Sequence, residues 1–265
     1  MTEVHFFVGL HQPADAQHFE LACISINRLR GRKKPVACAR VLVDSGAFTE
    51  LLIHGAYRHG VEEYAAELHR LYTTGVVKIA AAVAQDYMCE PFMLAKTGLT
   101  VEAHQRLTVE RYDALKAELD RLFEGECPFP VMPVLQGYAP SDYVRHIEMY
   151  GGRLTHGMWV GVGSVCKRNG KPESIVEVLA AIHHVHPDLL LHGFGVKSTA
   201  LLHPGVRDLL YSADSMAWSF AARRAGRNAN CWREAKAFSD RVRNLASVAV
   251  DSWQLPLPLF RWGFA

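Results

Sequence analysis

The stretch ARVLVDSG at residues 39–46 decides the fold, because it is a short apolar run of β-forming residues that ends on an aspartate and a glycine turn. Six similar runs recur, several followed by a segment with helical spacing: VHFFVGL (4–10), VVKIAAAVAQD (76–86), PVMPVLQG (130–137), GMWVGVGS (157–164), LLLHGFG (189–195) and YSADS (211–215). Such alternation predicts parallel strands joined by helices. A weaker run, CISINRL (23–29), brings the number of predicted strands to eight.

Four segments between or after these runs carry apolar residues at helical spacing: 61–74, 101–123, 172–185 and 229–248. Gly75 follows the first of them, as suits the residue that ends a helix. A (β/α)8 barrel takes about 250 residues, and the chain has 265. We therefore expect an α/β fold with one domain over residues 1–265: a single TIM-type barrel with a C-terminal helix.

Composition limits the possible partners. Hydrophobic residues make up 49% of the chain and charged residues 21%, which is typical of a globular protein with a sizeable core. The net charge of +2 means that any contact with nucleic acid must come from a local patch. No apolar run approaches the roughly 20 residues of a membrane span, so no membrane partner is expected. Six cysteines without a CxxC pair, and a first segment unlike a secretory signal, predict reduced thiols and a cytoplasmic location.

Several predicted strands end on polar or turn residues, and in an α/β barrel these ends form the active site. The residues are Asp44, Asp86, Gln136, Gly163, Ser164, Phe194 and Asp214. Taken singly, each fits a turn or a helix cap equally well. Together they place three carboxylates and a glutamine around one mouth, where like charges raise at least one pKa. Two carboxylates around a sugar suit displacement at an anomeric carbon, with one attacking and the other transferring a proton.

At these residues the sequence resembles the tRNA-guanine transglycosylase superfamily, and most closely the branch that inserts 7-deazaguanines into DNA. The motifs that carry the resemblance follow one another along nearly the whole chain: GLHQP, DSGAFTEL, AQDYMCEP, KTG, HQRLTVE, PVLQGY, DYVRHIEMYG, VGVGSVCKR, HGFGVK and SADSMAWSFAAR. Each motif alone is weak, but their order is specific. The resemblance implies a base-exchange enzyme that replaces guanine in DNA by a free 7-deazaguanine of the preQ0 type.

The resemblance also implies roles for the strand-end residues. Asp214 matches the nucleophile that forms a covalent aspartyl-glycosyl intermediate, and Asp44 matches the general acid/base. Asp86 and Gln136 match the residues that bind the Watson–Crick edge of a guanine-like base. The remaining base contacts that it implies are a backbone group near Gly163 or Ser164 and stacking by Phe194. His11 follows the first predicted strand, so it is either a further residue of the site or a structural histidine.

No cofactor and no metal are expected. Members that act on tRNA hold zinc with a CxCxxC motif and a distant histidine beyond the nucleophile, whereas this chain has only Cys231 and no histidine after Asp214. Since a structural zinc ion needs four ligands, we expect the family's zinc subdomain to be lacking.

Basic residues near the predicted mouth are candidate phosphate contacts: Lys167, Arg168, Lys197, Arg223, Arg224 and Arg227. A single charge of this kind is more often solvated than bound, so the candidates count as a group. Extruding a nucleotide from a duplex costs a few kcal/mol of stacking, which a single strand, a mismatch or a helper protein would reduce.

The sequence leaves three alternatives to a base-exchange enzyme that acts on DNA. A tRNA-acting enzyme is disfavoured by the missing zinc motif, and a non-catalytic binding subunit by the presence of both Asp44 and Asp214. A barrel glycosidase acting on free sugars usually has several tryptophans at its strand ends, and the sequence offers no such set.

Overall fold

A computed structural model describes residues 4–168 and 170–251 of the chain, with side chains up to residue 244. Its sheet has the order β5-β4-β3-β2-β1-β9-β8-β7-β6, and all neighbouring strands are parallel. The strands are β1 His5–Gly9, β2 Leu21–Ser25, β3 Arg40–Asp44, β4 Ile79–Val83, β5 Val131–Met132, β6 Val134–Leu135, β7 Trp159–Val162, β8 Leu190–Gly193 and β9 Ser212–Ser215.

The nine strands correspond to the eight predicted runs, because β5 and β6 are two halves of the run 130–137. Pro133 separates them, and a proline has no N–H group to donate to a neighbouring strand. The first half pairs with β4 and the second with β7, so this single run brings the two sides of the sheet together. The prediction of a TIM-type α/β barrel is therefore confirmed.

One predicted strand, CISINRL, is wrong in its second half. The strand β2 begins earlier, at Leu21, and ends at Ser25, after which Ile26–Leu29 form the short helix α1. The Ser25 hydroxyl accepts a hydrogen bond from the backbone N–H of Asn27 at 3.4 Å, which is a helix N-cap contact. This cap turns the chain at the end of β2 and places Asn27 and Arg28 at the mouth of the barrel.

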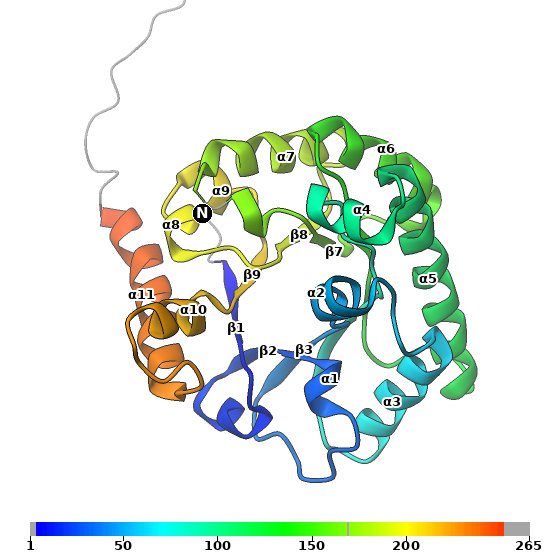
Figure 1. Cartoon of the computed structure of the whole chain (residues 1–265), viewed down its shortest axis with the longest axis horizontal. Helices are drawn as coiled ribbons and strands as arrows, with labels where there is room; N and C mark the ends of the chain where they lie inside the picture. The colour runs from blue at the N-terminus through cyan, green and yellow to red at the C-terminus, as the bar shows by residue number, and fades with distance from the viewer. Residues whose placement is uncertain (1–3, 169, 252–265) are drawn as a thin grey trace, which may run out of the picture.

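Helices surround the barrel (Figure 1). The longer ones are α3 Val61–Thr73, α5 Val101–Leu122, α6 Pro140–Tyr150, α7 Pro172–Val185, α10 Ala217–Arg224 and α11 Trp232–Asp251. Shorter helices include α2 Ala47–Thr49, α4 Pro91–Thr97, α8 Ser198–Leu201 and α9 Pro204–Arg207. None of the helices in the described ranges combines the length and apolarity that crossing a bilayer requires.

The core has two parts, because successive residues of a strand point to opposite faces of the sheet. The larger part lies between the sheet and the helices and includes Tyr64, Leu68 and Leu71 of α3. The smaller part fills the barrel interior with side chains from six strands: Phe7, Cys23, Leu42, Ala81, Val83, Met132 and Val134. The interior is thus packed, and a ligand can enter the space above it, at the carboxyl ends of the strands.

Candidate active site

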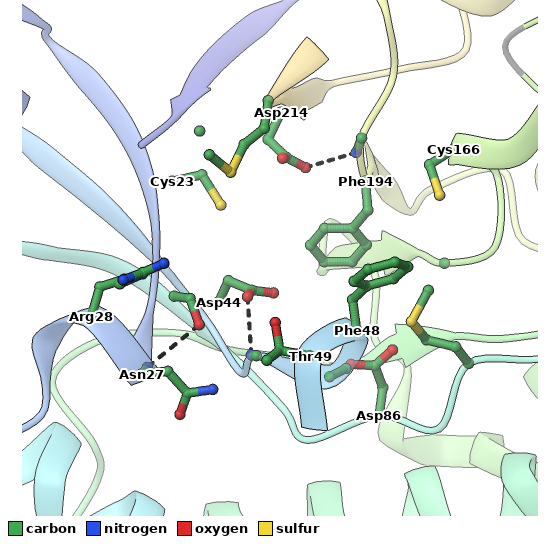
Figure 2. Close-up of a pocket in the computed structure, with 18 of the residues that line it drawn as sticks. Cys23, Asn27, Arg28, Asp44, Phe48, Thr49, Asp86, Cys166, Phe194 and Asp214 are labelled. Carbon is green, nitrogen blue, oxygen red and sulfur yellow. Dashed lines mark hydrogen bonds between the residues drawn. The ribbon is translucent and has the colours of Figure 1, made fainter. Parts of the chain in front are cut away.

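A cavity of about 590 Å³ opens at the carboxyl ends of the strands. The expected catalytic and base-binding residues all line it: His11, Asp44, Asp86, Gln136, Gly163, Ser164, Phe194 and Asp214. They come from β1, β3, β4, β6, β7, β8 and β9 or from the loops that follow these strands. Residues up to about 200 positions apart in the sequence therefore share one chamber (Figure 2).

Asp44 is the last residue of β3 and points into the cavity (Figure 2). Its Oδ2 atom accepts a hydrogen bond from the backbone N–H of Gly46 at 3.0 Å. Gly46 has a φ of 81°, a left-handed conformation that favours glycine. Burial, assisted by the nearby carboxylate of Asp214, raises the pKa of Asp44 to about 6. A carboxyl group with this pKa exchanges protons readily near neutral pH.

Asp214 enters the same cavity from β9. Its Oδ1 atom accepts a hydrogen bond from the backbone N–H of Gly195 at 3.0 Å and lies 3.4 Å from Nε2 of the buried His192. Cys23 lies beside both carboxylates (Figure 2), and burial, followed by Asp214 and Asp44, raises the pKa of its thiol. The thiol is therefore neutral beside two acids.

Asp86 and Gln136 form a pair at another wall of the cavity. Gln136 Nε2 donates a hydrogen bond to Asp86 Oδ2, and the Ser45 hydroxyl donates to Oδ1 at 3.3 Å. Burial is the main cause that raises the pKa of Asp86 to about 7, and the charge of Asp44 adds to it. An ionised carboxylate beside an amide offers acceptors and a donor to the edge of a planar base.

Ser164 joins this pair to a buried glutamate. Its hydroxyl lies 2.8 Å from Gln136 Oε1, 3.0 Å from Glu90 Oε2 and 3.1 Å from the backbone nitrogen of Cys89. The residue has a φ of 58°, a left-handed conformation that is uncommon for residues other than glycine. Burial raises the pKa of Glu90, whose side chain is almost fully enclosed.

Two glycines leave room for the side chains of the site. A Cβ atom on Gly163 would lie 2.1 Å from Nε2 of Gln136, and one on Gly161 would lie 2.4 Å from the ring of Phe194. The chain thus approaches the amide and the ring more closely than any other residue would allow. Phe194 and Phe48 extend toward each other inside the cavity (Figure 2).

His11 lines the cavity near α10. Its Nε2 atom lies 2.8 Å from the hydroxyl of Ser219, and its ring contacts Trp218 edge-on. Burial, followed by the charges of Arg28 and Arg223, lowers the pKa of His11. The imidazole is therefore neutral at physiological pH.

The six candidate phosphate contacts lie outside the cavity lining. Lys167 and Arg168 belong to the loop after β7, Lys197 precedes α8, and Arg223 and Arg224 end α10. These loops and helices follow the carboxyl ends of the strands. Arg227 differs from the others, because Glu234 binds its guanidinium at 2.6 Å. That ion pair reduces the charge Arg227 can offer to a phosphate.

Several lining residues were missed in the sequence. Phe48 stands in the DSGAFTEL motif itself, and its aromatic ring among turn residues was the available signal. Asn27 and Arg28 were assigned to a strand. Arg58 also lines the cavity and binds the buried Glu50 through two contacts of 3.0 and 2.8 Å. The local sequence gives no pattern that indicates this pairing.

Within the described residues, no cluster of three or more histidine, cysteine, aspartate or glutamate side chains is placed to hold a metal ion. A search among curated proteins gave no match. A family model, described as DpdA, DeoxyPurine in DNA protein A, matches residues 1–265. Because the match covers the full sequence, in agreement with the resemblance to the 7-deazaguanine branch, the chain belongs to the DpdA family.

Proposed function

We propose that this protein replaces guanine in DNA by a 7-deazaguanine of the preQ0 type, through a covalent aspartyl-glycosyl intermediate. Membership of the DpdA family implies a transglycosylase-type enzyme of deazapurine modification in DNA. The observation that carries the finer proposal is that Asp44 and Asp214, 170 positions apart, line one cavity beside the Asp86–Gln136 pair. Two carboxylates and an edge-binding pair are what base exchange at a nucleoside requires.

In the first half of the reaction, Asp214 attacks C1′ of the target deoxyguanosine. The bond from C1′ to the base breaks, its electron pair leaves with guanine, and a bond from C1′ to Asp214 forms. Guanine takes up a proton from Asp44, whose pKa of about 6 leaves a useful fraction protonated near neutral pH. The Gly195 N–H and His192 hold the attacking carboxylate in place.

In the second half, a free 7-deazaguanine occupies the space left by guanine. It gives a proton to Asp44, and its ring nitrogen then attacks C1′ and displaces Asp214. The carboxylates alone supply nucleophile and proton transfer, so the proposed reaction needs no cofactor.

The base would be recognised at its Watson–Crick edge. An ionised Asp86 would accept the two N–H donors of a guanine-like base, and the amide of Gln136 would donate to its carbonyl oxygen. A backbone group at Gly163 or Ser164 would add a contact. Phe194, with Phe48 opposite, would stack on the ring, and His11 would border the sugar. Both guanine and the incoming base satisfy this pattern, as an exchange enzyme requires.

We also propose that residues 1–265 form one domain. The protein would lie in the cytoplasm, which keeps its six free cysteines reduced. Phosphates of the DNA would contact the basic residues around the mouth. A helper protein that opens the duplex would lower the cost of extruding the target nucleotide.

The test is release of radiolabelled guanine from DNA or tRNA in the presence of preQ0. We expect release from DNA, loss of both release and the covalent adduct in Asp214→Ala, and mainly weaker base binding in Asp86→Ala. Asp188→Ala, an exposed aspartate at the opposite end of β8, is the matched control and should leave release unchanged.

Three results would contradict the proposal. An adduct in the Asp214→Ala protein would move the nucleophile elsewhere. Equal release from tRNA and DNA would remove the preference for DNA. Binding without any release, from either nucleic acid, would point to a non-catalytic subunit.

A further inference from the structure

Exposed aromatic side chains gather around the mouth of the cavity. Phe48 of α2, Phe92 of α4, Tyr138 after β6 and Phe220 of α10 are between 39% and 56% exposed. All four follow the carboxyl ends of strands, so they lie on the face that carries the cavity. Single exposed apolar residues need no explanation, but a group of rings around one opening is characteristic of a binding surface.

A cation accompanies each of these rings. Lys167 Nζ lies 5.4 Å from the ring centres of both Phe48 and Phe92, Arg168 lies 4.8 Å from Tyr138, and Arg224 lies 5.9 Å from Phe220. These distances fall within the range of cation–π attraction. Each of these exposed rings thus has a cation over it.

The cations on these rings keep their charge available. In the described ranges, no carboxylate lies within 4.0 Å of Lys167, Arg168 or Arg224, whereas Arg227 and Arg58 are both held in ion pairs. Burial raises the pKa of Glu90 and outweighs the charges of Lys167 and Arg168, which lower it. A phosphate approaching the mouth would therefore meet uncompensated positive charge.

Rings and cations together indicate an unpaired strand. Phosphates of a duplex and of a single strand attract cations alike, but only unpaired bases can stack on aromatic side chains. The helices α4 and α10 lie on different sides of the central opening (Figure 1), so a strand bound to both would cross the mouth. The target nucleotide would then enter the cavity between them.

We propose that the mouth binds unpaired DNA, with bases next to the target stacking on Phe92 and Tyr138 and their phosphates held by Lys167 and Arg168. This inference rests on the proposed function in taking DNA as the substrate, and it adds the form of that substrate. The enzyme acts on a strand already opened, rather than opening a duplex itself.

The test is the affinity for a fluorescent 20-residue oligothymidine, alone and paired with oligodeoxyadenosine. Neither contains guanine, so binding is measured without base exchange. We expect tighter binding of the single strand, and a loss of about 5- to 150-fold in Phe92→Ala and in Tyr138→Ala. Tyr138→Phe keeps the ring and should retain the affinity, whereas Tyr138→Leu keeps the bulk and should not.

Salt dependence separates the cations from the rings. Lys167→Ala should reduce the slope of log affinity against log salt by about 0.7, the value for one phosphate contact with a single strand. Phe92→Ala should weaken binding with the slope unchanged. The controls lie at the opposite end of the barrel: Tyr72→Ala and Tyr211→Ala for exposed rings, and Lys78→Ala for charge.

Three outcomes would overturn the inference: equal affinity for the duplex and the single strand, equal losses in the ring variants and in the control tyrosines, or a dimer that Phe92→Ala dissociates while strand affinity stays unchanged. The last would assign the rings to a second copy of the chain. Guanine release, measured separately, tests the proposed function. Ring-dependent strand binding without guanine release would refute the proposed function alone. Guanine release without ring-dependent strand binding would refute only this inference.

Discussion

The hydroxyl of Ser164 has a single hydrogen, yet it lies within hydrogen-bond distance of two acceptors, Gln136 Oε1 and Glu90 Oε2. Gln136 Nε2 donates a hydrogen bond to Asp86, and this orients the amide. Its Oε1 atom therefore faces Ser164 and accepts a hydrogen bond from the hydroxyl. One hydrogen cannot serve both acceptors, so we predict that Glu90 is protonated and donates to the Ser164 oxygen instead. Burial, which raises the pKa of Glu90, favours this form.

These hydrogen-bond assignments predict different results for two substitutions of Glu90. Glu90→Gln offers an N–H donor in place of the acid proton, so we expect base affinity close to that of the native protein. Glu90→Ala removes the donor and frees Ser164 to turn, and we expect weaker guanine binding by about 1 to 3 kcal/mol. Calorimetric titration with free guanine measures both. Equal losses in the two variants would mean that Glu90 acts as a carboxylate.

The ionisation of Asp86 predicts the pH dependence of base binding. Its pKa is raised to about 7 mainly by burial, and only the ionised form accepts two N–H donors. Affinity for free guanine should therefore fall about tenfold for each pH unit below 7 and level off above it. In Asp86→Asn the affinity should be low and nearly independent of pH between 5 and 8. A native affinity that rises on acidification would contradict the assigned role.

The strand β7 illustrates how an element shapes the site without contributing a reactive group. Gly161 within the strand and Gly163 directly after it allow the ring of Phe194 and the amide of Gln136 to approach the backbone. Gly163→Ala would place a methyl group 2.1 Å from Nε2 of Gln136, so this side chain must move away from Asp86. We expect a loss of base binding with the fold retained.

Guanine titration and thermal unfolding measure the two effects of Gly163→Ala separately. Gly152→Ala, with no heavy atom within 4 Å of the added Cβ, is the control that should preserve guanine affinity. Unchanged affinity in Gly163→Ala would mean that the position of Gln136 does not matter for the base.

Elements were more predictable from the sequence than the contacts between them. The helix over 172–185 matches α7 at both ends, because a proline begins it and apolar residues repeat at helical spacing. The strand ends gave Asp44, Asp86 and Asp214, since barrel topology alone brings them together. The helical turn after Ser25 was missed, because Ile26 and Leu29 also suit a strand.

Glu90 was missed for a different reason. It directly precedes Pro91 at the start of α4, where an acidic residue is usual and needs no further explanation. Its contact with Ser164 spans 74 positions, and no periodicity in one sequence reports such a distance. The ring and cation pairs around the mouth are likewise contacts between separate loops.

For the molecule as a whole, gathering carboxylates in a buried site has a cost in stability. The folded protein raises the pKa of Asp86 from 3.8 to about 7, mainly by burial, and that of Asp44 to about 6. Both values lie above those of the unfolded chain, so the folded state is favoured when each carboxyl group is protonated. This stabilising contribution is complete below about pH 4. This contribution is lost as pH rises through the folded-state pKa.

Asp86→Asn should therefore stabilise the fold at pH 8, because a neutral amide can accept from Gln136, donate to the hydroxyl of Ser45 and has no charge to bury. The raised pKa corresponds to an upper limit on the order of 4 kcal/mol in the free energy of unfolding. The difference from the native protein should shrink as pH falls from 7 and vanish near pH 4. Urea unfolding at pH 8, 6 and 4 measures it, with the exposed Asp188→Asn as control. If Asp86→Asn proved less stable than the native protein at pH 8, the carboxylate would be stabilising the fold, and burial would not be what sets its pKa.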